Sequence, residues 1–293
     1  MILTDEQLKL RDSLYAKNSI VCEDCFLGYL VWKEKYGLTE KIINGTSVIL
    51  TSKNSVYSFP TLQDESSLVN VVNELTALDG FCFDRISLEQ KTLLEKAFPG
   101  RFDFREERGM FDYVYDIDSL CTVAGSKLSK KRNHINAFLS IYNDWKIKEI
   151  DESNLNEVLD FARVWYERKT GGDTEMGDLS LGYERDSLLK LVPHLKEIGA
   201  EGVALYVEGK IVAFTVGQRL SERAYDTVFE KADDTVRGAY NMINREFARY
   251  LKQKYPELKL INRENDLDLP GLRKAKLSYM PSLVVEKYSA RLK

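Results

Sequence analysis

The segment between residues 126 and 139 carries side chains that could bind the phosphate groups of a ligand. Lys127, Lys130, Lys131 and His134 occupy positions i, i+3, i+4 and i+7, and this spacing places them on one face of a helix. No acidic residue interrupts the segment, although the chain has 46 acidic and 42 basic side chains. The pattern therefore predicts a cationic ridge that binds phosphates. A solvated helix face without a ligand is the alternative that spacing alone leaves open.

The same predicted helix has an apolar stripe that would anchor it to the protein. The stripe consists of Leu128, Ile135, Phe138, Leu139 and Tyr142. Arg132 lies next to this stripe, so we expect its guanidinium to reach a partner inside the protein as well as a ligand phosphate.

A second group of polar side chains follows the end of a predicted strand. Asn262, Arg263 and Glu264 leave this strand, and ligands of open α/β sheets collect beyond the carboxyl ends of the strands. Arg273 and Lys276 follow on a short predicted helix. We therefore expect a ligand site beyond the end of this strand. A charged surface loop is the alternative.

A third stretch joins a predicted strand to a helix that begins near Gly238. Glu230 lies at the end of the strand, where it could act as a general base or hold an incoming amine. Arg237 and Gly238 form a turn whose backbone N–H groups could bind phosphates. Acetyl-CoA sites usually have more glycine at such a turn. Here Tyr240 follows closely, which hinders the close backbone approach that glycine permits.

Other functional classes lack their motifs in this sequence. Cys22 and Cys25 form a single C-x-x-C without a second ligand pair, so we expect free thiols in a reducing cytoplasm and no metal site. His134 and His194 belong to no metal spacing, and there is no P-loop or dinucleotide fingerprint. No apolar run is long enough to cross a bilayer, and the net charge of −4 confines any nucleic-acid contact to a local basic patch.

The order of predicted elements indicates an α/β (α+β) fold with mixed, largely antiparallel sheets flanked by helices. Residues 121–293 read as helices, antiparallel strands, a central helix, strand, helix and strand. This is the order of a GNAT (acyl-CoA N-acyltransferase-like) domain, and residues 1–120 read as a degenerate copy. We therefore expect tandem GNAT-like domains with a boundary near residue 120. Within this scheme we expect strands in the segments LGYLVWKEKYGL and SLVVEKY.

Three motifs resemble a bacterial family of stand-alone proteins related to the C-terminal domain of phosphatidylglycerol lysyltransferases. They are KLSKKRNHINAF, FEKAD with AYNMINREFA, and INRENDLDLPGLRKAKLSYMPSLVVEKY. The resemblance implies a tandem GNAT fold, shared with the Fem-type aminoacyl transferases. It also implies transfer of an aminoacyl group from aminoacyl-tRNA to an acceptor, which is a lipid hydroxyl in the lysyltransferases. Gly271, Leu272, Arg273 and Lys276 match the family ending, so the resemblance assigns a donor-site role to Arg273 and Lys276.

The leading hypothesis is therefore a cytoplasmic enzyme that uses aminoacyl-tRNA as donor and a small molecule or lipid as acceptor. Lys130, Lys131 and Arg132 would contact the tRNA acceptor end, and Glu230 and Asn262 would line the reacting cleft. Two alternatives remain at this point. One is an acyl-CoA-dependent N-acyltransferase that acts on a small amine, and the other is a non-catalytic binding module with the same fold.

Overall fold

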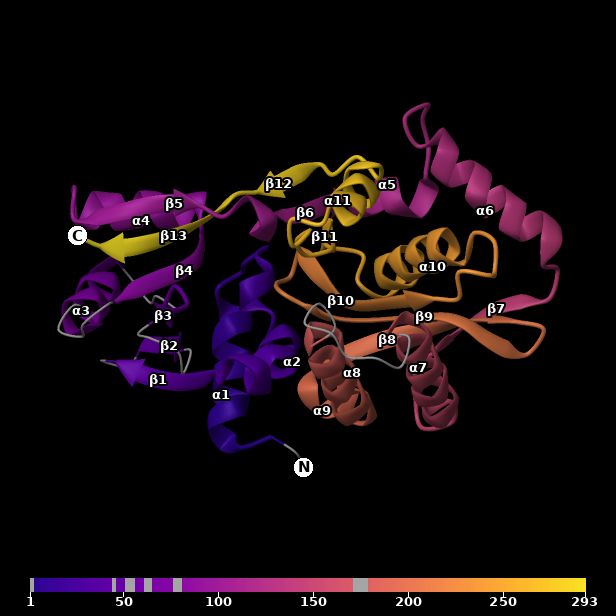
Figure 1. The fold of residues 1–293 in the computed structure, drawn as a ribbon, viewed down its shortest axis with the longest axis horizontal. Helices are drawn as coiled ribbons and strands as arrows, with labels where there is room; N and C mark the ends of the chain where they lie inside the picture. The colour runs from indigo at the N-terminus through magenta and orange to yellow at the C-terminus, as the bar shows by residue number, and fades with distance from the viewer. Residues whose placement is uncertain (1–2, 44–45, 51–55, 61–64, 76–80, 171–178) are drawn as a thin grey trace.

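A computed structural model describes residues 3–43, 46–50, 56–60, 65–75, 81–170 and 179–293. Two β-sheets lie side by side, each packed against helices (Figure 1). The helices α1 (Asp5–Ala16) and α2 (Phe26–Tyr36) lie between the two sheets. The expected α/β architecture with mixed, largely antiparallel sheets and flanking helices is confirmed.

The first sheet has the strand order β1-β2-β3-β4-β13-β5. Among its described strands, β3 and β4 run parallel and the other neighbours run antiparallel. Helices α3 and α4 supply the apolar side chains that cover one face, and Ser87 with Gln90 forms a capping box at the start of α4. The elements are β1 (Thr39–Ile43), β2 (Thr46–Leu50), β3 (Val56–Tyr57), α3 (Glu65–Leu75), β4 (Cys82–Ser87), α4 (Leu88–Ala97), β5 (Phe102–Glu106) and β13 (Lys287–Leu292).

The second sheet has the strand order β12-β6-β11-β10-β9-β8-β7, with β10 and β11 parallel. Its strands are β6 (Asp112–Asp116), β7 (Trp145–Glu149), β8 (Ala200–Val207), β9 (Lys210–Arg219), β10 (Ala224–Ala232), β11 (Leu260–Asn262) and β12 (Leu283–Val285). The remaining α-helices are α5 (Ile117–Thr122), α6 (Ser129–Ile141), α7 (Leu155–Thr170), α8 (Leu179–Leu191), α9 (Leu195–Ile198), α10 (Ala239–Lys254) and α11 (Pro270–Leu277). Helices α5, α6 and α10 share one core with this sheet.

The two sheets exchange strands with respect to chain order. Strand β6, which precedes residue 120, pairs with β11 and β12 in the second sheet. Strand β13, near the C-terminus, lies between β4 and β5 in the first sheet. The division into domains 1–120 and 121–293 therefore stays a prediction. Strand pairing connects the two parts at two places, through β6 in the second sheet and through β13 in the first.

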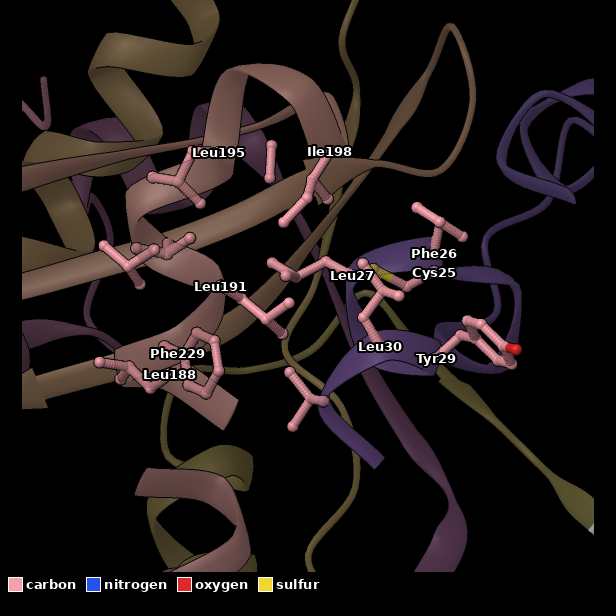
Figure 2. Close-up of a cluster of buried hydrophobic side chains, with 14 of the residues drawn as sticks. Cys25, Phe26, Leu27, Tyr29, Leu30, Leu188, Leu191, Leu195, Ile198 and Phe229 are labelled. Carbon is pink, nitrogen blue, oxygen red and sulfur yellow. The ribbon is translucent and has the colours of Figure 1, made fainter. Parts of the chain in front are cut away.

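The prediction of a strand from Leu27 to Leu38 is wrong, because most of this segment forms helix α2. Its residues from Phe26 to Val31 are buried on every side, so the sequence shows no clear amphipathic period. Figure 2 shows the reason: Leu27 and Leu30 pack against Leu191 and neighbouring side chains of α8 and α9. The helix is buried between the two halves, and burial conceals its periodicity.

The segment SLVVEKY was expected to form one final strand, and this is also wrong. It is divided at Glu286 into β12, which pairs with β6, and β13, which begins at Lys287 and pairs with β4 and β5. The chain thus passes from the second sheet to the first at this point (Figure 1).

A buried ionic group joins the halves where the chain changes sheets. The ammonium of Lys287 is fully buried, and it donates to Asp112 at 3.1 Å and to the carboxylate of Glu23. Asp112 also accepts from the backbone N–H of Cys22 at 3.0 Å and from Asn262 at 2.9 Å. Cys22, Glu23 and Asp112 offer ligand atoms within 4.8 Å of one another. Lys287 already supplies the cation that such a group requires.

We predict that Lys287→Met lowers the free energy of unfolding by about 3–5 kcal/mol, because it leaves two buried carboxylates without their cation. Urea unfolding followed by tryptophan fluorescence measures this change. Lys293→Met is the control, because Lys293 is half-exposed and pairs with Asp103 at 3.5 Å. That variant should lose less than about 1 kcal/mol. Equal stabilities of the two variants would contradict the role given to Lys287.

Candidate functional site

An ion pair near the carboxyl ends of β10 and β11, two interior strands of the second sheet, forms the centre of the candidate site. Strands β10 and β11 run parallel, so the residues that follow them emerge at the same edge. Glu230 of β10 accepts a hydrogen bond from the guanidinium of Arg263 at 2.6 Å, and both side chains are mostly buried. Asn244 of α10 donates to the second oxygen of Glu230 at 3.3 Å. Both oxygens of this carboxylate are therefore engaged.

An aromatic ring joins this ion pair to the predicted cationic helix. The guanidinium of Arg263 lies 5.0 Å from the ring centroid of Tyr279, and the ammonium of Lys131 lies 4.2 Å from the same centroid. Asn241 donates to the Tyr279 hydroxyl at 2.6 Å. Burial, together with the charge of Arg263, lowers the pKa of Lys131. Lys131 of α6 and Arg263, which follows β11, thus contact the same tyrosine ring.

Lys276 of α11 adds a third cation to the group. Its ammonium donates to the backbone carbonyl of Arg263, and its own carbonyl accepts from the buried Tyr115 hydroxyl at 2.9 Å. Burial, and then the charge of Arg263, lowers the pKa of Lys276 to about 8, against the opposite influence of Glu264 and Glu230. The cation is therefore held in a place where a ligand anion would stabilise it.

The structure brings four of the sequence-predicted residues together: Glu230, Arg263, Lys131 and Lys276. Lys130 and His134 on α6 are exposed to solvent, and so is Lys127. The predicted place of Lys127 on the same helix face is wrong, because α6 begins at Ser129 and Lys127 lies in the preceding turn. Arg132 donates to the carbonyls of Val123 and Gly125 at 2.9 and 3.0 Å, so it has the internal partner that its position next to the apolar stripe suggests.

Arg273 has its partners inside the loop that joins β11 to α11, and Asn262 links the start of this loop to other segments. Arg273 donates to both oxygens of Asp266, at 2.7 and 2.9 Å, and to Asp268 at 2.6 Å. Asn262 is fully buried, donates to Asp112 and to the carbonyl of Ile20, and accepts from the N–H of Glu264 at 2.7 Å. Both residues fix the loop that carries Arg263 and Glu264 in place.

The turn at Arg237 and Gly238 is packed against α6. Gly238 has a φ of +84°, and a Cβ there would lie 2.5 Å from the carbonyl oxygen of His134. The N–H of Ala239 already donates to the carbonyl of Val236 at 3.1 Å. Arg237 is exposed. Glycine is thus required here by the close approach of α6 to the start of α10.

Sequence reasoning gave no site role to Tyr115, Tyr279, Asn241 and Asn244. The two tyrosines are buried like ordinary core residues. Their contact with the guanidinium of Arg263 is what distinguishes them from other core tyrosines. Glu264 was noted at the strand end without a role of its own. It has a φ of +56°, which is uncommon for a residue other than glycine. Burial raises the pKa of Glu264 to about 8, Asp112 acts in the same direction, and Lys276 opposes both.

The chain belongs to the family described as phosphatidylglycerol lysyltransferase, C-terminal, whose model matches residues 18–291. The resemblance seen in the three sequence motifs is therefore confirmed. Among the described residues, no helix combines the length and the apolar character that a membrane span requires.

Solved structures agree with this assignment. A conserved protein of unknown function from Bacteroides thetaiotaomicron is 33% identical with a TM-score of 0.87, and the match covers 100% of this chain and 99% of that one. L-PGS from Bacillus licheniformis has the same fold, with 17% identity and a TM-score of 0.70 over 97% of this chain and 91% of that one. The expected tandem GNAT-like fold is thus confirmed.

A curated relative from Mycoplasmoides gallisepticum, an uncharacterized protein, is 26% identical over 182 residues. The match covers 62% of this chain and 56% of that protein. The chain therefore spans little more than half the length of that curated relative.

We predict that Glu264→Gln raises the free energy of unfolding at pH 9 by a few kcal/mol. The folded pKa of about 8 exceeds the unfolded value of about 4.3, so the wild-type protein loses stability as the pH rises between these values. Glutamine removes this loss, and the gain should disappear below about pH 4. Urea unfolding at several pH values measures it. Glu222→Gln, at an exposed turn, should show no such pH dependence, and a matching profile for both variants would contradict the prediction.

Proposed function

We propose that this protein transfers an aminoacyl group from aminoacyl-tRNA to an acceptor nucleophile. The family and the fold are those of an aminoacyl transferase domain. The observation that carries the proposal is the meeting of Lys131, Arg263 and Lys276 around Tyr279 and Glu230, because these cations come from three separate elements. Such a group suits a donor that carries phosphates and develops negative charge during the reaction.

The exposed side of α6 supports tRNA as the donor. Lys130 is open to solvent on the helix that supplies Lys131, and Lys127 is open to solvent in the turn before it. A tRNA acceptor end has phosphates on a single strand, and neutralising them with lysine supplies most of the binding free energy. On this proposal the protein acts in the cytoplasm, where aminoacyl-tRNA is present.

The chemistry requires alignment more than activation, because the ester of the donor is already reactive. When the acceptor attacks the ester carbonyl, its oxygen becomes an oxyanion. Lys276 and Arg263 would stabilise this charge. Glu230 was considered as a general base, but Arg263 and Asn244 occupy both of its oxygens. Its role in the proposal is to hold the guanidinium in position.

The acyl-CoA alternative has less support. Its pyrophosphate would have to approach the turn at Gly238, and the carbonyl of His134 fills the space beside that glycine. A non-catalytic binding module is the alternative if the protein consumes neither aminoacyl-tRNA nor acyl-CoA.

We predict that the double variant Lys130→Ala, Lys131→Ala binds tRNA much more weakly, because two phosphate contacts are lost. The slope of log affinity against log salt should fall by about 1.4, at about 0.7 for each contact with a single strand. Filter binding at several salt concentrations measures both values. Lys9→Ala with Lys210→Ala is the charge-matched control, since both lysines are exposed on other elements. A similar loss in the control would mean that net charge alone is responsible.

We predict that Lys276→Met slows transfer by about 10²–10³-fold, because it removes one stabilising charge from the oxyanion. The measurement is the single-turnover loss of ester from a labelled pool of aminoacyl-tRNA. Lys274→Met, on the exposed side of the same helix, should keep the wild-type rate. Both variants should bind tRNA to a similar extent, and equal transfer rates would contradict the assignment of Lys276.

A further inference from the structure

A cleft is lined by α2, by strands of the first sheet and by the loop that follows β11. Its volume is about 360 Å³. Aromatic side chains of α2 line it, among them Tyr29, Trp32 and Tyr36, together with Tyr57 of β3. Glu264 lines the same cleft and follows Arg263 directly in the chain. Through Glu264, the cleft therefore borders the loop that carries Arg263.

The cations that line this cleft already have partners. Arg85 pairs with Asp84 at 3.1 Å. Lys35 donates to Ser180 at 2.6 Å, and its ammonium lies 5.0 Å from the ring centroid of Trp32. An anionic ligand such as a phosphate headgroup would thus find no uncommitted cation among the described lining residues.

The carboxylate of Glu264, in contrast, is open to a ligand. Its side chain makes no hydrogen bond or ion pair with any other residue in the described part of the chain. Its backbone is fixed on both sides, because its N–H donates to Asn262 at 2.7 Å and its carbonyl accepts from the N–H of Tyr113 at 3.1 Å. The left-handed φ of +56° is held by these contacts, and such strain commonly accompanies a functional position.

We propose that this cleft binds the acceptor and that the acceptor is a primary amine on an apolar or aromatic body. The proposal rests on the proposed function. The positive charge of the ammonium would favour the ionised form of Glu264 and pair with it, and the aromatic walls of α2 would cover the apolar body and attract the positive charge. The chemistry of the cleft thus points to amide formation, in which nitrogen is the attacking atom.

The transfer step balances with groups already present. The bound ammonium gives one proton to the Glu264 carboxylate, and the free amine nitrogen forms a bond to the ester carbonyl carbon of the aminoacyl-tRNA. The bond from this carbon to the ribose oxygen then breaks. The ribose oxygen takes the second nitrogen proton and leaves as a hydroxyl. The products are an amide and free tRNA, and Glu264 returns its proton to solvent.

Binding of phenethylamine to the protein without tRNA is the first experiment. Calorimetry should show binding that weakens at least tenfold in Glu264→Gln and stays unchanged in Glu222→Gln. Trp32→Leu is a second variant that should also weaken binding, since it removes an aromatic wall. 2-Phenylethanol, which has the same body without the charge, should bind at least tenfold more weakly than the amine. Equal binding of the amine and the alcohol would overturn the proposal.

Transfer is the second experiment, with labelled aminoacyl-tRNA and either phenethylamine or vesicles that contain phosphatidylglycerol. Formation of the amide, lost in Glu264→Gln, supports the inference. Transfer to the vesicles but not to the amine overturns the inference and leaves the proposed function standing. A third outcome is that the wild-type protein binds the amine through Glu264 but causes no loss of ester with either acceptor. This outcome overturns both the inference and the proposed function.

Discussion

The ion pair between Glu230 and Arg263 is the interaction on which the rest of the candidate site depends. Three cations lie close together here, and their mutual repulsion would separate them in the absence of a counter-charge. Glu230 supplies this charge at 2.6 Å from Arg263. The face of Tyr279 supplies a further favourable environment for both Lys131 and Arg263. Parallel pairing of β10 with β11 brings the carboxylate and the guanidinium to the same edge of the sheet.

The same loop is connected to the buried junction between the halves. Asp112 accepts from Lys287 of β13 and from Asn262 of β11. Asn262 in turn holds the backbone of Glu264. A chain of hydrogen bonds therefore leads from the first sheet, through β6, to the two residues that follow β11. This connection explains why the strand exchange matters for function: it fixes the edge of the second sheet against the first half, and the cleft lies between them.

The site has two faces with different charge. On one side, α6 presents exposed lysines that continue the cation group toward solvent. The cleft, in contrast, is lined by aromatic side chains of α2 and by the carboxyl group of Glu264. A phosphate-bearing donor and a positively charged acceptor would be drawn to opposite faces and would meet at Arg263 and Lys276. This separation of charge is what makes the two substrates distinguishable to one protein.

The sequence by itself determined the elements with strong local signals and the fold class. The capping boxes at Thr4 and Ser87, the antiparallel strands β8 to β10 and the cationic face of α6 follow from patterns within a few residues, and the family ending was readable as a motif. Local patterns could also propose Glu230, Arg263, Lys131 and Lys276 one by one, because residue type and position at a strand end or on a helix face are local properties.

Only the tertiary structure decided which of these side chains meet. Burial on every side conceals the period of α2, so the segment read as a strand until its packing between the halves was known. The exchange of β6 and β13 between sheets has no local signal, since strand pairing depends on distant partners. The partners of Glu230 are likewise set by contacts between segments far apart in the chain. Charge and hydrogen bonding act over a few ångströms in space, and sequence spacing does not report that distance.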